Sequence, residues 1–273
     1  MIQDSAVLVD LNISVWTGRK LDKRVSEQVD ASNNTKTRAG NYHKKLLAGT
    51  EALDALHAAA NLLRQYHYEN TLPWSDSGTR LLPMSNFFDY KAGLADFQAN
   101  FNGALEDFVS QYDDLVSAAA FTLGDLFNPN DYPSAEQVRS KNSIRVVYSP
   151  VPNAGDFRVD IPNEYREELQ KISDERINAA MKDAWDRLHD CLKHMSEKLA
   201  GEQKQVFRDT LVTNALDLCV MLTRLNVTND PKLEQARKQL ESALIGVDAK
   251  ELRKHDAVRH DVKSRVDEIL SMF

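Results

Sequence analysis

The chain has 273 residues, 42% hydrophobic and 27% charged, with a formal net charge of −7. It is long enough to bury a substantial core, and this composition excludes intrinsic disorder. The negative charge argues against a general nucleic-acid binder, which needs a basic face for phosphates, although a local basic patch is compatible with it.

The sequence predicts neither a membrane span nor a signal peptide. No window approaches the roughly eighteen consecutive apolar residues of a membrane span, and the start MIQDSAVLVD lacks the basic, apolar and small-residue order of a signal peptide. We therefore expect a cytoplasmic protein without a membrane partner.

The N-terminal part predicts one strand followed by helices. Residues 6–16 alternate between apolar and mainly polar positions, which is the period of a strand with one buried face. Residues 21–29 have helical spacing, and a polar break follows them. A second helical stretch from residue 41 to 68 pauses at Gly49 before its main run.

The segment 67–83 is rich in aromatic, polar and turn-forming residues and is predicted to be a loop. Two interpretations stay open. Tyrosine, tryptophan and arginine often anchor protein interfaces, so Tyr68, Trp74, Asp76 and Arg80 are candidate interaction residues. Alternatively, Trp74 folds back and caps the helical core.

A long helix with a heavy aromatic stripe is predicted to start at Ser85 or Asn86, and we assign the stripe to the core. Ser134 stands where the N-cap of a further short helix would be. The runs 143–149 and 156–161 then alternate on either side of a Pro/Asn/Gly turn, which predicts an antiparallel hairpin. Since a lone hairpin is marginal in water, strand 6–16 is its natural third member.

Residues 162–199 form the longest periodic segment, and Pro162 suits the first turn of a helix. Helical spacing returns over 203–227, again after Asp230, and over 250–273. The fold class is therefore mainly α with a small antiparallel β-sheet, in which an antiparallel bundle is built on the long helix. We expect a single domain over residues 1–273, with a C-terminal helical subdomain over 203–273.

The search for chemistry finds no nucleotide-binding, zinc-protease, calcium-loop or serine-hydrolase motif, so we expect no cofactor and lean towards a protein that is not an enzyme. Asp186, Asp190 and Asp217 could form a carboxylate metal site between helices. Acidic residues at helical spacing are, however, usually a solvated face. Cys191 and Cys219 fall on apolar helix faces, which favours small core residues over a disulfide or a nucleophile.

Three stretches are distinctive: LVDLNISVWTGRKLDKRVSEQV, HYENTLPWSDSGTRLLP and VPNAGDFRVDIP. Together they resemble a domain-of-unknown-function family of tailed bacteriophages, prophages and other bacterial mobile elements, over nearly the whole chain. That family has no assigned catalytic residues. Its members tend to be encoded near a hexameric AAA+ ATPase of the MoxR or cobalt-chelatase type and a von Willebrand factor A protein. The resemblance implies an accessory or adaptor role in the bacterial host cytoplasm.

The leading hypothesis is a non-catalytic interaction protein that recruits or regulates such an ATPase complex, with Trp74 and Arg80 as anchors. One alternative is a metal-dependent hydrolase that uses the three aspartates named above. Another is an anti-defence protein that binds a host immune component or its signalling nucleotide. The long helix and the apolar residues at 269–273 would also allow a helix-mediated homo-oligomer, as in a coiled coil.

Overall fold

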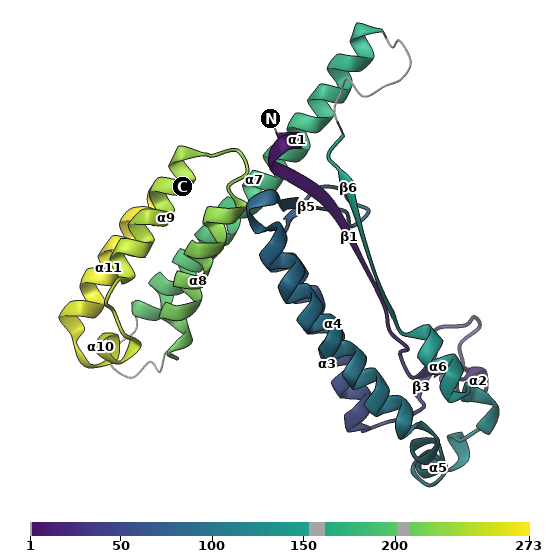
Figure 1. The fold of residues 1–273 in the computed structure, drawn as a ribbon. Coiled ribbons are helices and arrows are strands. Elements are labelled where there is room, and N and C mark those ends of the chain that lie inside the picture. The colour runs from purple at the N-terminus through teal and green to yellow at the C-terminus, as the bar shows by residue number, and fades with distance from the viewer. Residues whose placement is uncertain (1, 153–161, 201–207) are drawn as a thin grey trace. The chain divides into compact units, whose positions relative to one another are not determined.

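The computed structural model describes residues 2–152, 162–200 and 208–273 (Figure 1). It contains two compact units. The first comprises Met1–Asp10, Tyr68–Lys91 and Val147–Phe273, and the second comprises Leu11–His67 and Ala92–Val146. The single domain over 1–273 and the subdomain over 203–273 stay predictions.

Helices dominate both units, as the sequence predicts. The α-helices are α1 (Ile2–Ser5), α2 (Lys23–Ser32), α3 (Glu51–Glu69), α4 (Phe87–Ser110), α5 (Tyr112–Leu123), α6 (Ala135–Lys141), α7 (Asn163–Leu199), α8 (Thr210–Leu225), α9 (Pro231–Leu244), α10 (Ala249–Lys254) and α11 (Asp256–Leu270). Short 3₁₀ turns are η1 (Met84–Asn86), η2 (Gly124–Leu126) and η3 (Pro129–Asp131). The strands are β1 (Ala6–Ser14), β2 (Arg19–Leu21), β3 (His43–Lys45), β4 (Leu72–Pro73), β5 (Arg80–Pro83) and β6 (Ser143–Pro150).

A four-stranded sheet has the order β4-β5-β1-β6, and β1 runs beside β6 (Figure 1). The predicted neighbourhood of the N-terminal strand and the run 143–149 is thus confirmed. The predicted run 156–161 lies outside the described residues.

The prediction that 67–83 is entirely a loop is wrong, because β4 and β5 form an antiparallel pair there. Leu72 stands opposite Leu81, and Pro73 stands opposite Arg80. β5 also pairs with β1, so this segment lies inside the sheet.

The core of the first unit forms on the C-terminal half of α7. Buried residues of α7 between Ala180 and Leu199 pack in one cluster with apolar side chains of α8, α9, α10 and α11. In Figure 1 α8 and α11 lie along that half of α7, and α9 packs against both of them. The predicted 162–199 helix and the helical C-terminal third are confirmed. Asp230 caps α9 as predicted, since its carboxylate accepts from the Lys232 backbone nitrogen at 2.9 Å.

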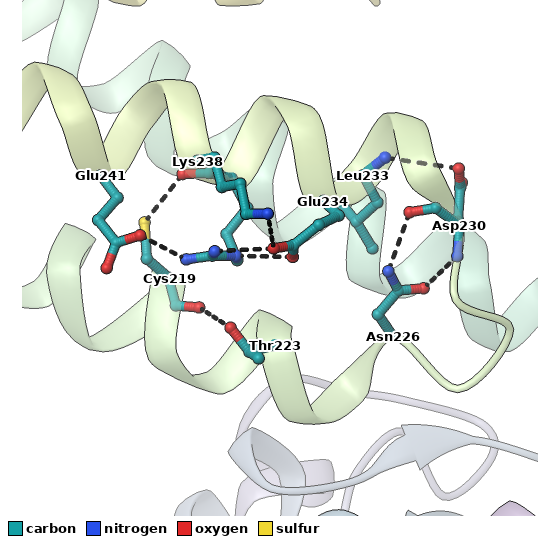
Figure 2. A network of polar contacts seen from close by, with 9 residues as sticks. Cys219, Thr223, Asn226, Asp230, Leu233, Glu234, Lys238 and Glu241 are labelled. Carbon is teal, nitrogen blue, oxygen red and sulfur yellow. Dashed lines mark hydrogen bonds and ion pairs between the residues drawn. The ribbon is translucent and has the colours of Figure 1, made fainter.

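A polar network joins α8 to α9 (Figure 2). Arg237 is 7% exposed, and it donates from two nitrogens to Glu234 at 2.8 and 2.9 Å and from a third to Glu241 at 2.8 Å. These bonds compensate the burial of a charge, which would otherwise be costly. Cys219 Sγ donates to the Arg237 carbonyl at 3.7 Å, so this cysteine is a core residue, as predicted.

The core of the second unit is aromatic. Trp16 contacts Phe108 and Tyr112, with ring centroids 6.0 and 5.8 Å apart. The aromatic stripe of α4 is mostly buried, as predicted, although Phe88 in the first unit is 77% exposed. Ser134 forms a full capping box with Gln137 at the start of α6, which confirms the predicted N-cap.

Residues 43–45 form β3 and residues 46–49 form a turn, so the helix predicted to run from residue 41 to Gly49 is wrong. The physical reason is Lys44, which is 5% exposed and has Nζ 2.7 Å from Asp131 and 3.5 Å from Asp22. Its Nζ also donates to the Leu126 carbonyl at 2.6 Å. This long-range ion pairing favours a strand that sequence periodicity did not indicate.

Candidate interaction surface at Tyr68 and Arg80

Arg80 is the residue that organises this surface in the first unit. Its Nε donates to Thr71 Oγ1 at 2.7 Å, and its Nη2 donates to the Thr71 carbonyl at 2.9 Å. The guanidinium carbon lies 4.8 Å from the centroid of the Tyr68 ring, within the range of a cation–π interaction. Burial lowers the pKa of Arg80 below its ordinary value, an effect partly offset by Asp183, and the group still carries its charge at neutral pH.

Arg187 on α7 holds the backbone beneath this pair. It donates to three carbonyl oxygens, those of Glu69 at 2.7 Å, Tyr68 at 2.8 Å and Thr71 at 2.8 Å. Its Nε also donates to Asp183 at 2.8 Å. Two of these carbonyls belong to the last two residues of α3, where helical backbone acceptors lack intrahelical partners, and the third follows the helix, so one side chain satisfies all three.

Tyr68 itself remains 53% exposed. Its backbone is held by Arg187, and its ring is held by Arg80. A large ring on a fixed frame loses little conformational freedom on binding, which is the property of an interface anchor.

Trp74 lies elsewhere, because it is 6% exposed and belongs to the hydrophobic core with Leu72 and Leu81. The structure therefore favours the interpretation in which Trp74 caps the core. It does not support the interpretation in which Trp74 is an exposed interface anchor. The strand period explains the difference. Leu72 and Trp74 are two residues apart and share one face, whereas Arg80 stands opposite Pro73 on the other.

Asp76 is exposed in the turn between β4 and β5. The turn is closed by the Gly78 nitrogen, which donates to the Ser75 carbonyl at 3.2 Å, and Gly78 has φ of 97°. The structure thus brings Tyr68 and Arg80 together, presents Asp76 at the turn, and places Trp74 inside.

The three carboxylates of the alternative metal site are exposed on α7 and α8. Asp186 pairs with Lys182 one turn away at 2.5 Å, and Asp190 is 82% exposed. Asp217 is exposed on α8. Among residues 2–152, 162–200 and 208–273, no group of three or more His, Cys, Asp or Glu could hold a metal ion. These positions favour the interpretation of a solvated helix face.

Cys191 and His194 line a pocket of about 240 Å³ between α7 and α8. Burial raises the pKa of the Cys191 thiol to about 11. The thiol is therefore protonated at neutral pH, which is the opposite of an activated nucleophile.

Sequence reasoning missed Thr71 and Arg187, which position the candidate pair. The Asp183–Arg187 spacing on α7 was visible as a helical ion pair, but its reach to residues 68–71 is a long-range contact with no local pattern.

No family model, curated protein or solved structure matches the chain. None of the helices in the described part of the chain is both long and apolar enough to pass through a lipid bilayer.

Proposed function

We propose that this protein is a non-catalytic adaptor that binds a protein partner through Tyr68 and Arg80. The observation that carries the proposal is the half-exposed Tyr68 ring, which is held by Arg80 at 4.8 Å on a backbone that Arg187 fixes. Tyrosine and arginine are among the residue types most enriched at interface hot spots.

The rigidity of the pair gives the proposal its energetic basis. Ordering a flexible side chain at an interface costs about 0.5–1.5 kcal/mol. Arg80 already donates twice to Thr71 in the free protein, so most of that cost is absent when a partner binds.

The partner class comes from the resemblance to the phage and mobile-element family. That resemblance implies a neighbouring AAA+ ATPase or a von Willebrand factor A protein, and we propose that one of these binds the surface. The anchors in this proposal are Tyr68 and Arg80, with Asp76 as a neighbouring polar contact. Trp74 is no longer among them, because its side chain lies in the core.

The test is co-purification of the chain with a MoxR-type ATPase and a von Willebrand factor A protein encoded beside it, followed by titration of the complex. Tyr68→Ala should weaken binding by at least tenfold, since truncation of a hot-spot residue costs about 2 kcal/mol or more. Tyr165→Ala is the matched control, because Tyr165 is a similarly exposed tyrosine, at 59%, on α7 of the same unit.

Three outcomes would contradict the proposal. The first is that the chain forms no complex with either candidate. The second is a complex that Tyr68→Ala binds with wild-type affinity. The third is an equal loss of affinity in Tyr68→Ala and Tyr165→Ala. A change in ATP hydrolysis on addition of the wild-type chain, absent with Tyr68→Ala, would extend the role from binding to regulation.

A further inference from the structure

One segment of this acidic chain carries a net positive charge. Between Arg19 and Lys45 there are eight Lys and Arg against three Asp and Glu, a net charge of +5. The rest of the chain has 26 against 38, a net charge of −12. The segment lies wholly in the second unit.

Strands β2 and β3 place two of these charges face to face. Their antiparallel register sets Arg19 directly opposite Lys45, and both side chains are exposed. Side chains at such positions have Cβ atoms about 5 Å apart, and like charges there destabilise a sheet. Among the residues that the structure describes, no ion pair neutralises either of them.

On the same two strands, one lysine is neutralised by carboxylates. Lys44, the neighbour of Lys45, points inward, where Asp22 and Asp131 pair with it. Lys20 stands opposite Lys44, on the other face of the strand pair from Arg19 and Lys45, and is exposed. The fold therefore compensates the inward lysine with two carboxylates and leaves the outward cations for another partner.

The start of α2 continues the pattern. Lys23 and Arg24 are exposed in its first turn, which contains no acidic residue. The anion at this helix start is the N-cap Asp22, whose carboxylate accepts from the Val25 nitrogen at 3.0 Å, so the two exposed cations stand beside a helix end that is already capped. We call Arg19, Lys23, Arg24 and Lys45 the basic ribbon.

We propose that the basic ribbon binds the phosphodiester backbone of a nucleic acid. Phosphate recognition uses Lys and Arg together with polar side chains and backbone nitrogens. The loop after α2 supplies such groups, since its exposed residues include Asn33, Thr35, Lys36 and Arg38. An acidic protein is the weaker fit, because interface cores are depleted in lysine and rely on buried apolar side chains.

The decisive measurement is fluorescence anisotropy of three labelled probes of 20 nucleotides or base pairs: single-stranded DNA, duplex DNA and single-stranded RNA. Each is titrated with the full chain at salt concentrations between 50 and 200 mM. Arg19→Gln combined with Lys45→Gln should lower affinity by roughly tenfold or more at low salt. It should also reduce the salt slope by about two, one for each lost phosphate contact. Lys193→Gln combined with Lys232→Gln removes the same charge from exposed positions of the first unit and should leave both quantities unchanged.

The fold of the ribbon variant is checked by thermal unfolding. Removing two opposed cations should leave the Tm unchanged or raise it. If the Tm falls instead, Lys23→Gln with Arg24→Gln supplies the same titration without altering the β2–β3 pair.

The proposal is overturned if none of the three nucleic acids binds, or if the ribbon and control variants lose affinity equally. It is also overturned if a glutamate-rich peptide displaces the nucleic acid at equal or lower concentration, which would assign the ribbon to an acidic protein. Binding of all three probes with equal salt slopes supports backbone recognition, and a preference for one identifies its source. Each result leaves the Tyr68 surface intact, so it is independent of the adaptor proposal.

Discussion

Replacement of Trp74 by alanine is the sharpest test of how the segment 67–83 is used. In the structure this side chain is 6% exposed, packs with Leu72 and Leu81, and lies 5.8 Å beneath the guanidinium of Arg176. The variant should therefore lose stability far more than it loses any surface contact.

The magnitude follows from the buried area. A tryptophan side chain buries about 150–250 Å², and at about 25 cal/mol per Å² this corresponds to roughly 4–6 kcal/mol as an upper bound. Measured Trp→Ala costs of about 3–5 kcal/mol agree with it. At about 2–4 °C per kcal/mol for a chain of this size class, the Tm should fall by roughly 6–20 °C.

The assay is urea unfolding at 25 °C, followed by far-UV circular dichroism and by fluorescence. Two probes are needed because a chain of two units need not unfold in one step, and only coincident transitions give a single free energy. Tyr68→Ala is the comparison. Its ring is half exposed, so we expect a loss of no more than about 1 kcal/mol, mainly the contact with Arg80.

The reasoning would be refuted by a Trp74→Ala protein whose unfolding free energy lies within about 1 kcal/mol of wild type. That result would mean that Trp74 is exposed in solution and available to a partner. A large loss for Tyr68→Ala would be equally damaging, since it would make Tyr68 a structural residue.

Further predictions test other buried groups. Lys44→Met should cost about 1–3 kcal/mol by thermal unfolding, because it leaves two partly buried carboxylates without their cation, and an unchanged Tm would contradict this. Arg187→Lys should cost about 1–3 kcal/mol, as lysine cannot reproduce the planar fork of four hydrogen bonds; wild-type stability would argue against the bracing role. A buried arginine of α9 lowers the pKa of Glu234 to about 2, so stability from this group is present above pH 4.5 and lost as pH falls towards 2. The urea midpoint should depend less on pH between pH 2 and 6 in Glu234→Gln than in the wild type. An identical pH dependence would exclude a contribution of this carboxylate to stability. Burial raises the pKa of Cys191 to about 11 and of Cys219 to about 12, so both should react slowly with a disulfide reagent at pH 8 until denaturant is added; rapid reaction of the native protein would oppose this.

The helical part of the fold was largely readable from the sequence because its determinants are local. The apolar period of α7, the proline before it, and the Ser134 and Asp230 caps act within a few residues of each other. Helix starts and stripes of this kind need no knowledge of distant partners.

The errors fall where distant residues decide the local conformation. Residues 43–45 form a strand because Lys44 meets Asp131, and 67–83 contains strands because β5 lies against β1. The candidate interaction surface also depends on a contact between residues that are distant in the sequence. Tyr68 and Arg80 could be named from residue type, but Arg187, about 120 residues further along, could not.

The burial of Trp74 changes what the adaptor hypothesis requires. A partner that needed Trp74 would have to unfold the β4–β5 pair, and it would have to supply more than the roughly 3–5 kcal/mol that the core gains from that side chain. A partner that uses Tyr68 needs no such rearrangement, because the ring is already exposed and held by Arg80. The core position of Trp74 therefore strengthens the case for Tyr68, since the buried tryptophan fixes the strand pair from which Arg80 reaches the tyrosine.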